Sequence, residues 1–156
     1  MRNLPLLPII LGLGGLIPFV GLALLAGVAG AEWSGKATLA LGAYAAVILA
    51  FLGGVHWGFA LTSGADASAA RARFGLGVLP SLVGWGGLLV MFTGLETVGV
   101  GIEAAGFVAL TIVEGRAAQR GLMPAGYIGL RYVLSGVVIV CLVSVCLVRI
   151  FGVRWV

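Results

Sequence analysis

Residues 4–30 read LPLLPIILGLGGLIPFVGLALLAGVAG, a stretch without a single charged side chain. A helix needs about 20 apolar residues to cross the hydrocarbon core of a bilayer. A helix on the surface of a soluble protein would keep one polar face, and this stretch has none. It therefore predicts a membrane-spanning helix.

Four further apolar runs follow the first, separated by short charged connections. The predicted spans are residues 4–30, 37–62, 76–95, 97–114 and 127–150. The fourth is the least apolar because Glu103 interrupts it. The longest connections, 63–75 and 115–126, leave no room for a soluble domain, so residues 1–156 form one transmembrane domain. Pro18, Pro80 and Pro124 are expected to kink or begin helices.

Composition supports an all-α integral membrane bundle. Hydrophobic residues make up 62% of the 156 residues and charged residues 9%, with a mean hydropathy of +1.22. A soluble domain carries about 25% charged residues. The 27 glycines suit helices that pack closely in lipid, and no alternating ten-residue segments indicate a β-barrel.

Several functional classes lack support. A pI of about 9.7 is compatible with nucleic-acid binding, but the basic residues lie in short connections rather than in one patch, which argues against it. No zinc spacing, phosphate-binding loop or Ser/His/Asp arrangement is present, so no catalytic or metal-ligating residue is predicted. Cys141 and Cys146 point to different faces of one helix and are interpreted as packing residues.

The distribution of Lys and Arg predicts the orientation. The first apolar stretch is much longer than the core of a signal peptide, so we expect an uncleaved helix. In membrane proteins, the cytoplasmic connections are enriched in Lys and Arg. The side of this chain with more basic residues is the side of the N-terminus, so we expect a cytoplasmic N-terminus and, after five spans, a C-terminus outside. Six basic residues fall on the N-terminal side, namely Arg2, Arg71, Arg73, Arg116, Arg120 and Arg131, and three on the other, namely Lys36, Arg149 and Arg154.

Small residues recur every four positions along the second predicted span. They are Gly42, Ala46, Ala50, Gly54 and Gly58, and they end in a GxxxG motif. Such a series allows close approach of another helix. The sequence leaves open whether that helix belongs to this chain or to another protein, although an internal partner is favoured.

His56 is the only histidine, and it lies about 8 Å inside the N-terminal side of the second span. It points away from the small residues, toward the side of Ala45 and Leu49. An intramembrane histidine could bind a cofactor such as haem or relay a proton. The favoured alternative is a neutral imidazole bonded to a neighbouring helix, with Trp57 as an interfacial anchor. A haem site with two histidines is excluded within one chain.

Glu103 and Glu114 lie eleven residues apart, so they share one face of the fourth span about 16 Å apart. This pattern could form a proton or cation path, but a buried, hydrogen-bonded Glu103 is the more frequent arrangement. Glu114 lies close in sequence to Arg116 and within possible reach of His56 or Arg131. An ion pair between Glu114 and Arg131 would join the fourth span to the fifth.

Four segments resemble a family of small polytopic membrane proteins known as domain of unknown function 3429. They are Gly14-Gly15-Leu16-Ile17-Pro18-Phe19, Phe51-Leu52-Gly53-Gly54-Val55-His56-Trp57-Gly58, Gly77-Val78-Leu79-Pro80-Ser81-Leu82 and Gly129-Leu130-Arg131-Tyr132. Members of this family occur in bacteria, and a related transmembrane protein occurs in mitochondria. The resemblance implies an inner-membrane location, bacterial or mitochondrial, and supplies no reaction.

Two functions are compatible with these features. The first is a non-catalytic accessory, assembly or interaction subunit of a larger respiratory or photosynthetic membrane complex. The second is a binder of a small lipophilic ligand such as a quinone or haem, or a proton or ion path, using His56, Glu103 and Glu114. Membrane-enzyme activity of these residues is the least favoured. The expected partners are the lipid bilayer and other membrane subunits, with no nucleic acid and no cofactor identified.

Overall fold

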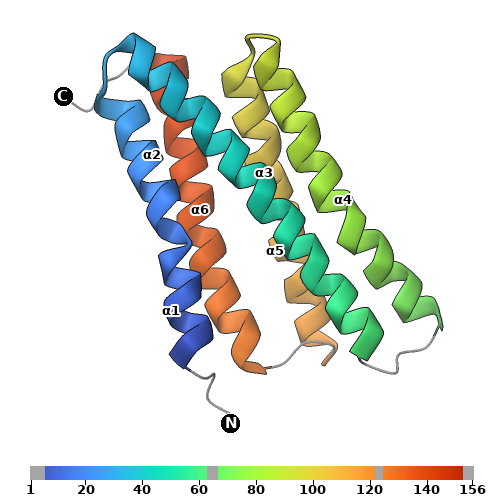
Figure 1. The fold of residues 1–156 in the computed structure, drawn as a ribbon. Helices are drawn as coiled ribbons and strands as arrows, with labels where there is room; N and C mark the ends of the chain where they lie inside the picture. Colours follow the sequence, from blue (N-terminus) through green and yellow to red (C-terminus); the bar gives the residue numbers. More distant parts are fainter. Residues whose placement is uncertain (1–5, 63–66, 122–124, 153–156) are drawn as a thin grey trace.

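A computed structural model describes residues 6–62, 67–121 and 125–152, and every regular element within these ranges is helical (Figure 1). The helices are α1 (Leu6–Gly14), α2 (Leu16–Val28), α3 (Ala31–Thr62), α4 (Ala67–Phe92), α5 (Glu96–Gln119) and α6 (Ala125–Phe151). Because α1 and α2 follow one another in a single apolar stretch, they make one span, and the described ranges hold five helical stretches long and apolar enough to cross a membrane. The predicted all-α membrane fold is confirmed.

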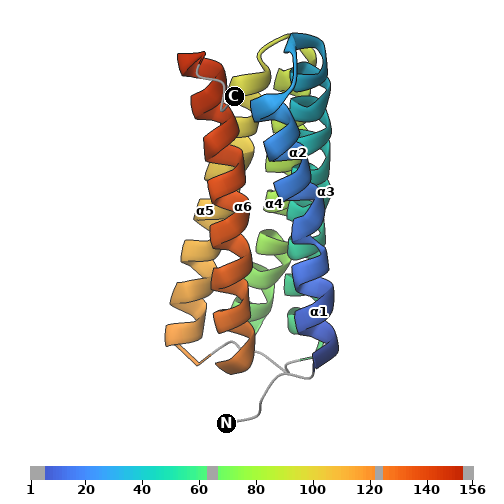
Figure 2. The same ribbon diagram turned by 90° about the vertical axis from the view of Figure 1, so that its left-hand side faces the viewer.

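The spans run alternately up and down in an elongated bundle (Figures 1 and 2). Helix α3 packs against α2, α4 and α5, while α6 closes the bundle against α2 and α5. We call the end where α1 begins the N-terminal end; α3 and α5 finish there and α6 starts there. Large apolar side chains from several helices fill the interior, including Phe19, Leu49, Phe107 and Leu142.

The first span is divided at Gly15, and α2 begins two residues before Pro18, one of the prolines expected to kink or begin a helix. Pro18 has no N–H with which to bond the carbonyl of Gly14, so the helical hydrogen-bond series is interrupted there. The Tyr44 hydroxyl on α3 donates to the Gly15 carbonyl over 3.1 Å. The break is thus held by a side chain of a neighbouring helix. Pro80 lies inside α4, which continues to Phe92, and Pro124 lies outside the described residues.

Helix α3 begins at Ala31 rather than at residue 37, and two further helices extend beyond the expected spans. Helix α4 begins at Ala67 rather than at residue 76, and α5 continues to Gln119 rather than ending at residue 114. Both extensions carry arginines, which can reach the membrane surface from a helix that projects past the hydrocarbon core. The Arg73 guanidinium also donates to the Phe59 carbonyl over 3.0 Å, tying the extension of α4 to α3.

Glycines set the close contact between α3 and α4. A Cβ placed on Gly53 would overlap the backbone carbonyl of Gly77. Further along the same pair, a Cβ on Gly84 would lie 2.8 Å from the Cα of Ala46. The two backbones approach so closely that no side chain fits between them at these positions, as is typical of small-residue packing in membranes.

Candidate functional site

A buried charged cluster joins three helices in the N-terminal half of the bundle. It consists of His56 on α3, Glu114 on α5, and Arg131 and Ser135 on α6. Each of these side chains is at most 6% exposed. His56, Glu114 and Arg131 lie within about two turns of the same end of the bundle, and Ser135 lies one turn beyond Arg131, so helices that run in opposite directions bring them together.

Glu114 is the centre of the charged cluster. Its Oε2 accepts a hydrogen bond of 2.7 Å from Arg131 Nε, and its Oε1 lies 3.3 Å from His56 Nε2. Arg131 Nη1 donates to the Ser135 hydroxyl over 2.8 Å. The expected ion pair between α5 and α6 is therefore present, and the same carboxylate faces the histidine of α3. Arg116, the other basic residue near Glu114, is exposed.

One donor of the cluster is left over. Arg131 Nη2 is buried without a hydrogen-bond partner among the described residues, whereas His56 Nε2 and Glu114 Oε1 face each other at 3.3 Å. With a neutral imidazole, the positive charge of Arg131 offsets the negative charge of Glu114, so the cluster carries no net charge. A guanidinium donor that remains free at this depth can bind an acceptor atom of a guest molecule.

Glu103 lies apart from this cluster. It is fully buried, and neither of its carboxyl oxygens has a hydrogen-bond partner among the described residues. Glycines make room for its side chain, since a Cβ on Gly87 would lie 2.8 Å from Glu103 Cγ and one on Gly42 would lie 3.2 Å from Oε2. Buried apolar side chains, Phe107 and Leu110, fill the helix face between Glu103 and Glu114. The described side chains thus do not connect the two carboxyls by a polar path.

The small-residue series of α3 does not form a single internal groove. Gly42 and Ala46 are buried against α4, whereas Ala50, Gly54 and Gly58 are exposed. The reason is geometric: each step of four residues turns about 40° around a helix, so the series rotates about 160° from its first member to its last. Gly53, eleven residues after Gly42, continues the buried face instead.

Trp57 belongs to the contact between α3 and α4. It is 44% exposed, and its indole N–H donates to the Phe74 carbonyl over 3.1 Å. Its ring also packs edge-on against the Phe74 ring, with 5.3 Å between centroids. A side chain on Gly77 would overlap the indole. The exposure of Trp57 is compatible with an interfacial anchor, which stays a prediction.

A cavity of about 100 Å³ adjoins the charged cluster. Arg131 is the one charged residue in its wall. The remaining wall is apolar or glycine and is drawn from α1, α2, α3, α5 and α6: Gly12, Gly15, Leu16, Phe19, Ile48, Phe51, Leu52, Phe107, Leu134 and Val138. Arg131 was predicted from the sequence as an intramembrane polar residue, but the cavity beside it was not. Gly15 and Pro18 were the available signals, because a helix break in lipid leaves space beside it.

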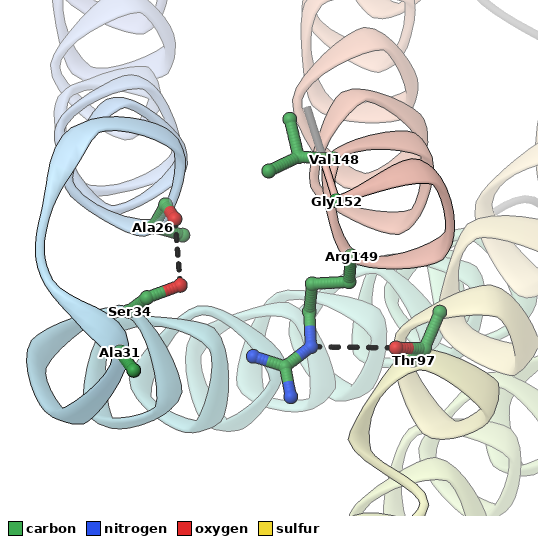
Figure 3. A pocket seen from close by; sticks show the side chains of 7 residues that line it. All are labelled: Ala26, Ala31, Ser34, Thr97, Val148, Arg149 and Gly152. Carbon is green, nitrogen blue, oxygen red and sulfur yellow. Dashed lines mark hydrogen bonds between the residues drawn. The ribbon is translucent and has the colours of Figure 1, made fainter. Parts of the chain in front are cut away.

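A larger and more open pocket of about 310 Å³ lies at the opposite end of the bundle, between the α2–α3 connection and the ends of α5 and α6 (Figure 3). Arg149 reaches across it and donates to the Thr97 hydroxyl over 3.3 Å. Its guanidinium also forms an ion pair of 2.5 Å with Glu96. Ser34 on the other wall donates to the Ala26 carbonyl over 2.7 Å. The charge of Arg149 is thus already offset within the chain.

Comparison with known proteins identifies a family and a transmembrane relative. Residues 4–147 match the model of a family described as "Protein of unknown function (DUF3429)". Transmembrane protein 69 of Xenopus tropicalis is 39% identical over 89 residues, which are 57% of this chain and 35% of that protein. The aligned part therefore spans about a third of the relative's length. No solved structure matches the chain. With most of its length covered by the family model, this multi-pass membrane protein belongs to the DUF3429 family.

Proposed function

We propose that the protein is a non-catalytic accessory or interaction subunit that docks α3 onto a transmembrane helix of a larger membrane complex. The observation that carries the proposal is the exposed small-residue surface of α3 formed by Ala50, Gly54 and Gly58. A Cβ on Gly54 would meet no atom within 4 Å. Large exposed side chains, Phe51 and Leu61, flank the surface and give it a notched profile.

The bilayer explains why such a surface favours a partner. Apolar side chains gain nothing by leaving lipid for another apolar surface, so helix association depends on close packing and on backbone approach. A GxxxG motif provides that approach. Within the chain, glycines allow the same close backbone approach between α3 and α4 at Gly53 and Gly77. The exposed motif can allow a similar approach by a helix of another protein.

Substitution of Gly54 by leucine tests the docking surface. Leucine would fill the notch without disturbing the packing inside the chain, since the position is open. We expect the wild-type protein to migrate with a larger complex on native gels after extraction in mild detergent, and Gly54→Leu to lose at least nine-tenths of that association. Mass spectrometry of the wild-type band would identify the partner subunits.

Gly136 on α6 provides the matched control, because it is also exposed and also open to an added Cβ. Gly136→Leu is expected to retain the association. A wild-type protein that migrates alone under all mild detergents, or a Gly54→Leu variant that associates as the wild type does, would contradict docking through α3.

The membrane we propose is the bacterial inner membrane, or the mitochondrial inner membrane in a eukaryote. These membranes house respiratory and photosynthetic complexes, which are the proposed class of partner. The excess of arginine at the N-terminal end supports a cytoplasmic, or matrix, N-terminus. A reporter fused to the C-terminus is then expected to be active only outside the cytoplasm, and cytoplasmic activity would reverse the proposed orientation.

A further inference from the structure

The cavity beside Arg131 changes from polar to apolar along the direction of the membrane normal. Arg131 lies six residues into α6, about 9 Å from the N-terminal end, whereas Val138 lies about 20 Å from it. Phe19 and Phe107 line the cavity with Val138, and both are fully buried. A guest would therefore place its polar group toward the membrane surface and its apolar part toward the bilayer centre.

The cavity is too small for an aromatic ring but suits an alkyl chain. Its volume is about 100 Å³, and an engineered cavity of about 150 Å³ is the size known to accept benzene. A hydrocarbon chain is narrower than an aromatic ring. The part of the chain that does not fit in the cavity can extend out of it. Phe51 shows where it would leave, because this residue lines the cavity and is also 65% exposed on the lipid-facing surface of α3.

The polar end offers a hydrogen-bond donor. Arg131 Nη2 is buried and has no hydrogen-bond partner within 3.5 Å among the described residues, while Nε and Nη1 are occupied by Glu114 and Ser135 and the Tyr127 side chain lies near the same guanidinium group. Leaving such a donor unsatisfied away from water is unfavourable, and an acceptor atom on a guest would satisfy it. Since Glu114 already offsets the charge of Arg131, a carbonyl oxygen is sufficient as the acceptor.

We propose that this cavity binds an acyl chain whose carbonyl oxygen accepts a hydrogen bond from Arg131 and whose alkyl part extends between α1, α2 and α3. Both a free fatty acid and a phospholipid carry this chemistry. The proposal does not depend on docking of another protein, because it uses the interior of the bundle rather than the Ala50, Gly54 and Gly58 surface.

The test measures saturable retention of two probes by the full chain in mild detergent: radiolabelled palmitic acid and radiolabelled dipalmitoyl phosphatidylglycerol. About one acyl lipid per chain is expected for the wild type. Retained palmitate alone would identify the free acid as the source, and retained phospholipid would identify the membrane lipid. The proposal is overturned if the wild type retains no more of either probe than the cavity-filling variant Leu134→Trp does. Preferential binding of a decyl-substituted benzoquinone would also overturn the proposal, since its ring exceeds the cavity.

Leu134→Trp fills the cavity from α6 and is expected to lower retention at least tenfold. Val133→Trp is the matched control, because it adds the same ring on the exposed side of the same helix and is expected to bind as the wild type does. If Leu134→Trp does not fold, Gly12→Leu narrows the cavity from α1, where an added Cβ would lie 2.9 Å from the Leu134 side chain. Wild-type retention in a folded cavity-filling variant would contradict binding at this place.

Arg131→Lys tests the anchor separately. Lysine keeps the positive charge beside Glu114 but lacks the planar group that serves three acceptors at once. We expect about tenfold weaker retention with little change in the thermal stability of the protein. Unchanged retention in this variant would remove Arg131 from the site.

Discussion

Arg131→Leu is expected to destabilise the bundle by about 3–5 kcal/mol, the largest effect of any single substitution considered for this chain. The substitution removes the partner of Glu114, which is fully buried, and leaves a carboxylate in the protein interior without its cation. It also removes the donor to Ser135. The free energy of unfolding is measured in detergent or bicelles by steric trapping or denaturant titration.

The double variant Glu114→Gln with Arg131→Leu separates loss of charge pairing from loss of packing. Because it removes both charges, it should recover a large part of the stability that Arg131→Leu loses. If Arg131→Leu is as stable as the wild type, the charged cluster does not hold α5 to α6. If the double variant is as unstable as the single one, shape rather than charge accounts for the loss.

Two adjacent glycines of α3 are expected to respond in opposite directions to the same substitution. Gly53→Ala should destabilise the protein by about 1–3 kcal/mol, because its methyl group would overlap the Gly77 carbonyl and force α3 and α4 apart. Gly54→Ala meets open space and should be neutral or stabilising by up to about 1 kcal/mol, since alanine favours the helix over glycine.

The comparison is made on the purified protein, away from any partner, by thermal unfolding followed by circular dichroism. Since the two variants have the same composition, each is the control for the other. Equal effects at both positions would mean that the close approach of α3 and α4 at Gly53 and Gly77 does not contribute to stability.

The number of spans and the level of the charged cluster followed from the sequence. Apolar runs give the crossings, and positions counted from the ends of those runs place His56, Glu114 and Arg131 at similar depth. What hydropathy cannot give is the rotation of each helix. Glu114 contacts both Arg131 and His56 because α3, α5 and α6 are rotated so that these side chains face one another. That rotation is determined by the packing of side chains from all five spans.

The small-residue series of α3 shows the same limit in more detail. Counting every fourth residue suggested one groove from Gly42 to Gly58, but the accumulated rotation places its two halves on different sides. A series spaced by eleven residues, from Gly42 to Gly53, follows the buried face more closely. For the cavity, Gly15 and Pro18 mark the helix break beside it, but its volume and lining depend on which space the side chains of neighbouring helices leave unfilled.

A series of reporter fusions placed after each of the five spans tests the central claim that each crosses the bilayer. Reporters in the connections and at the C-terminus are expected to alternate, active outside after the first, third and fifth spans and inside after the second and fourth. Two consecutive reporters on the same side of the membrane would contradict the five-crossing bundle.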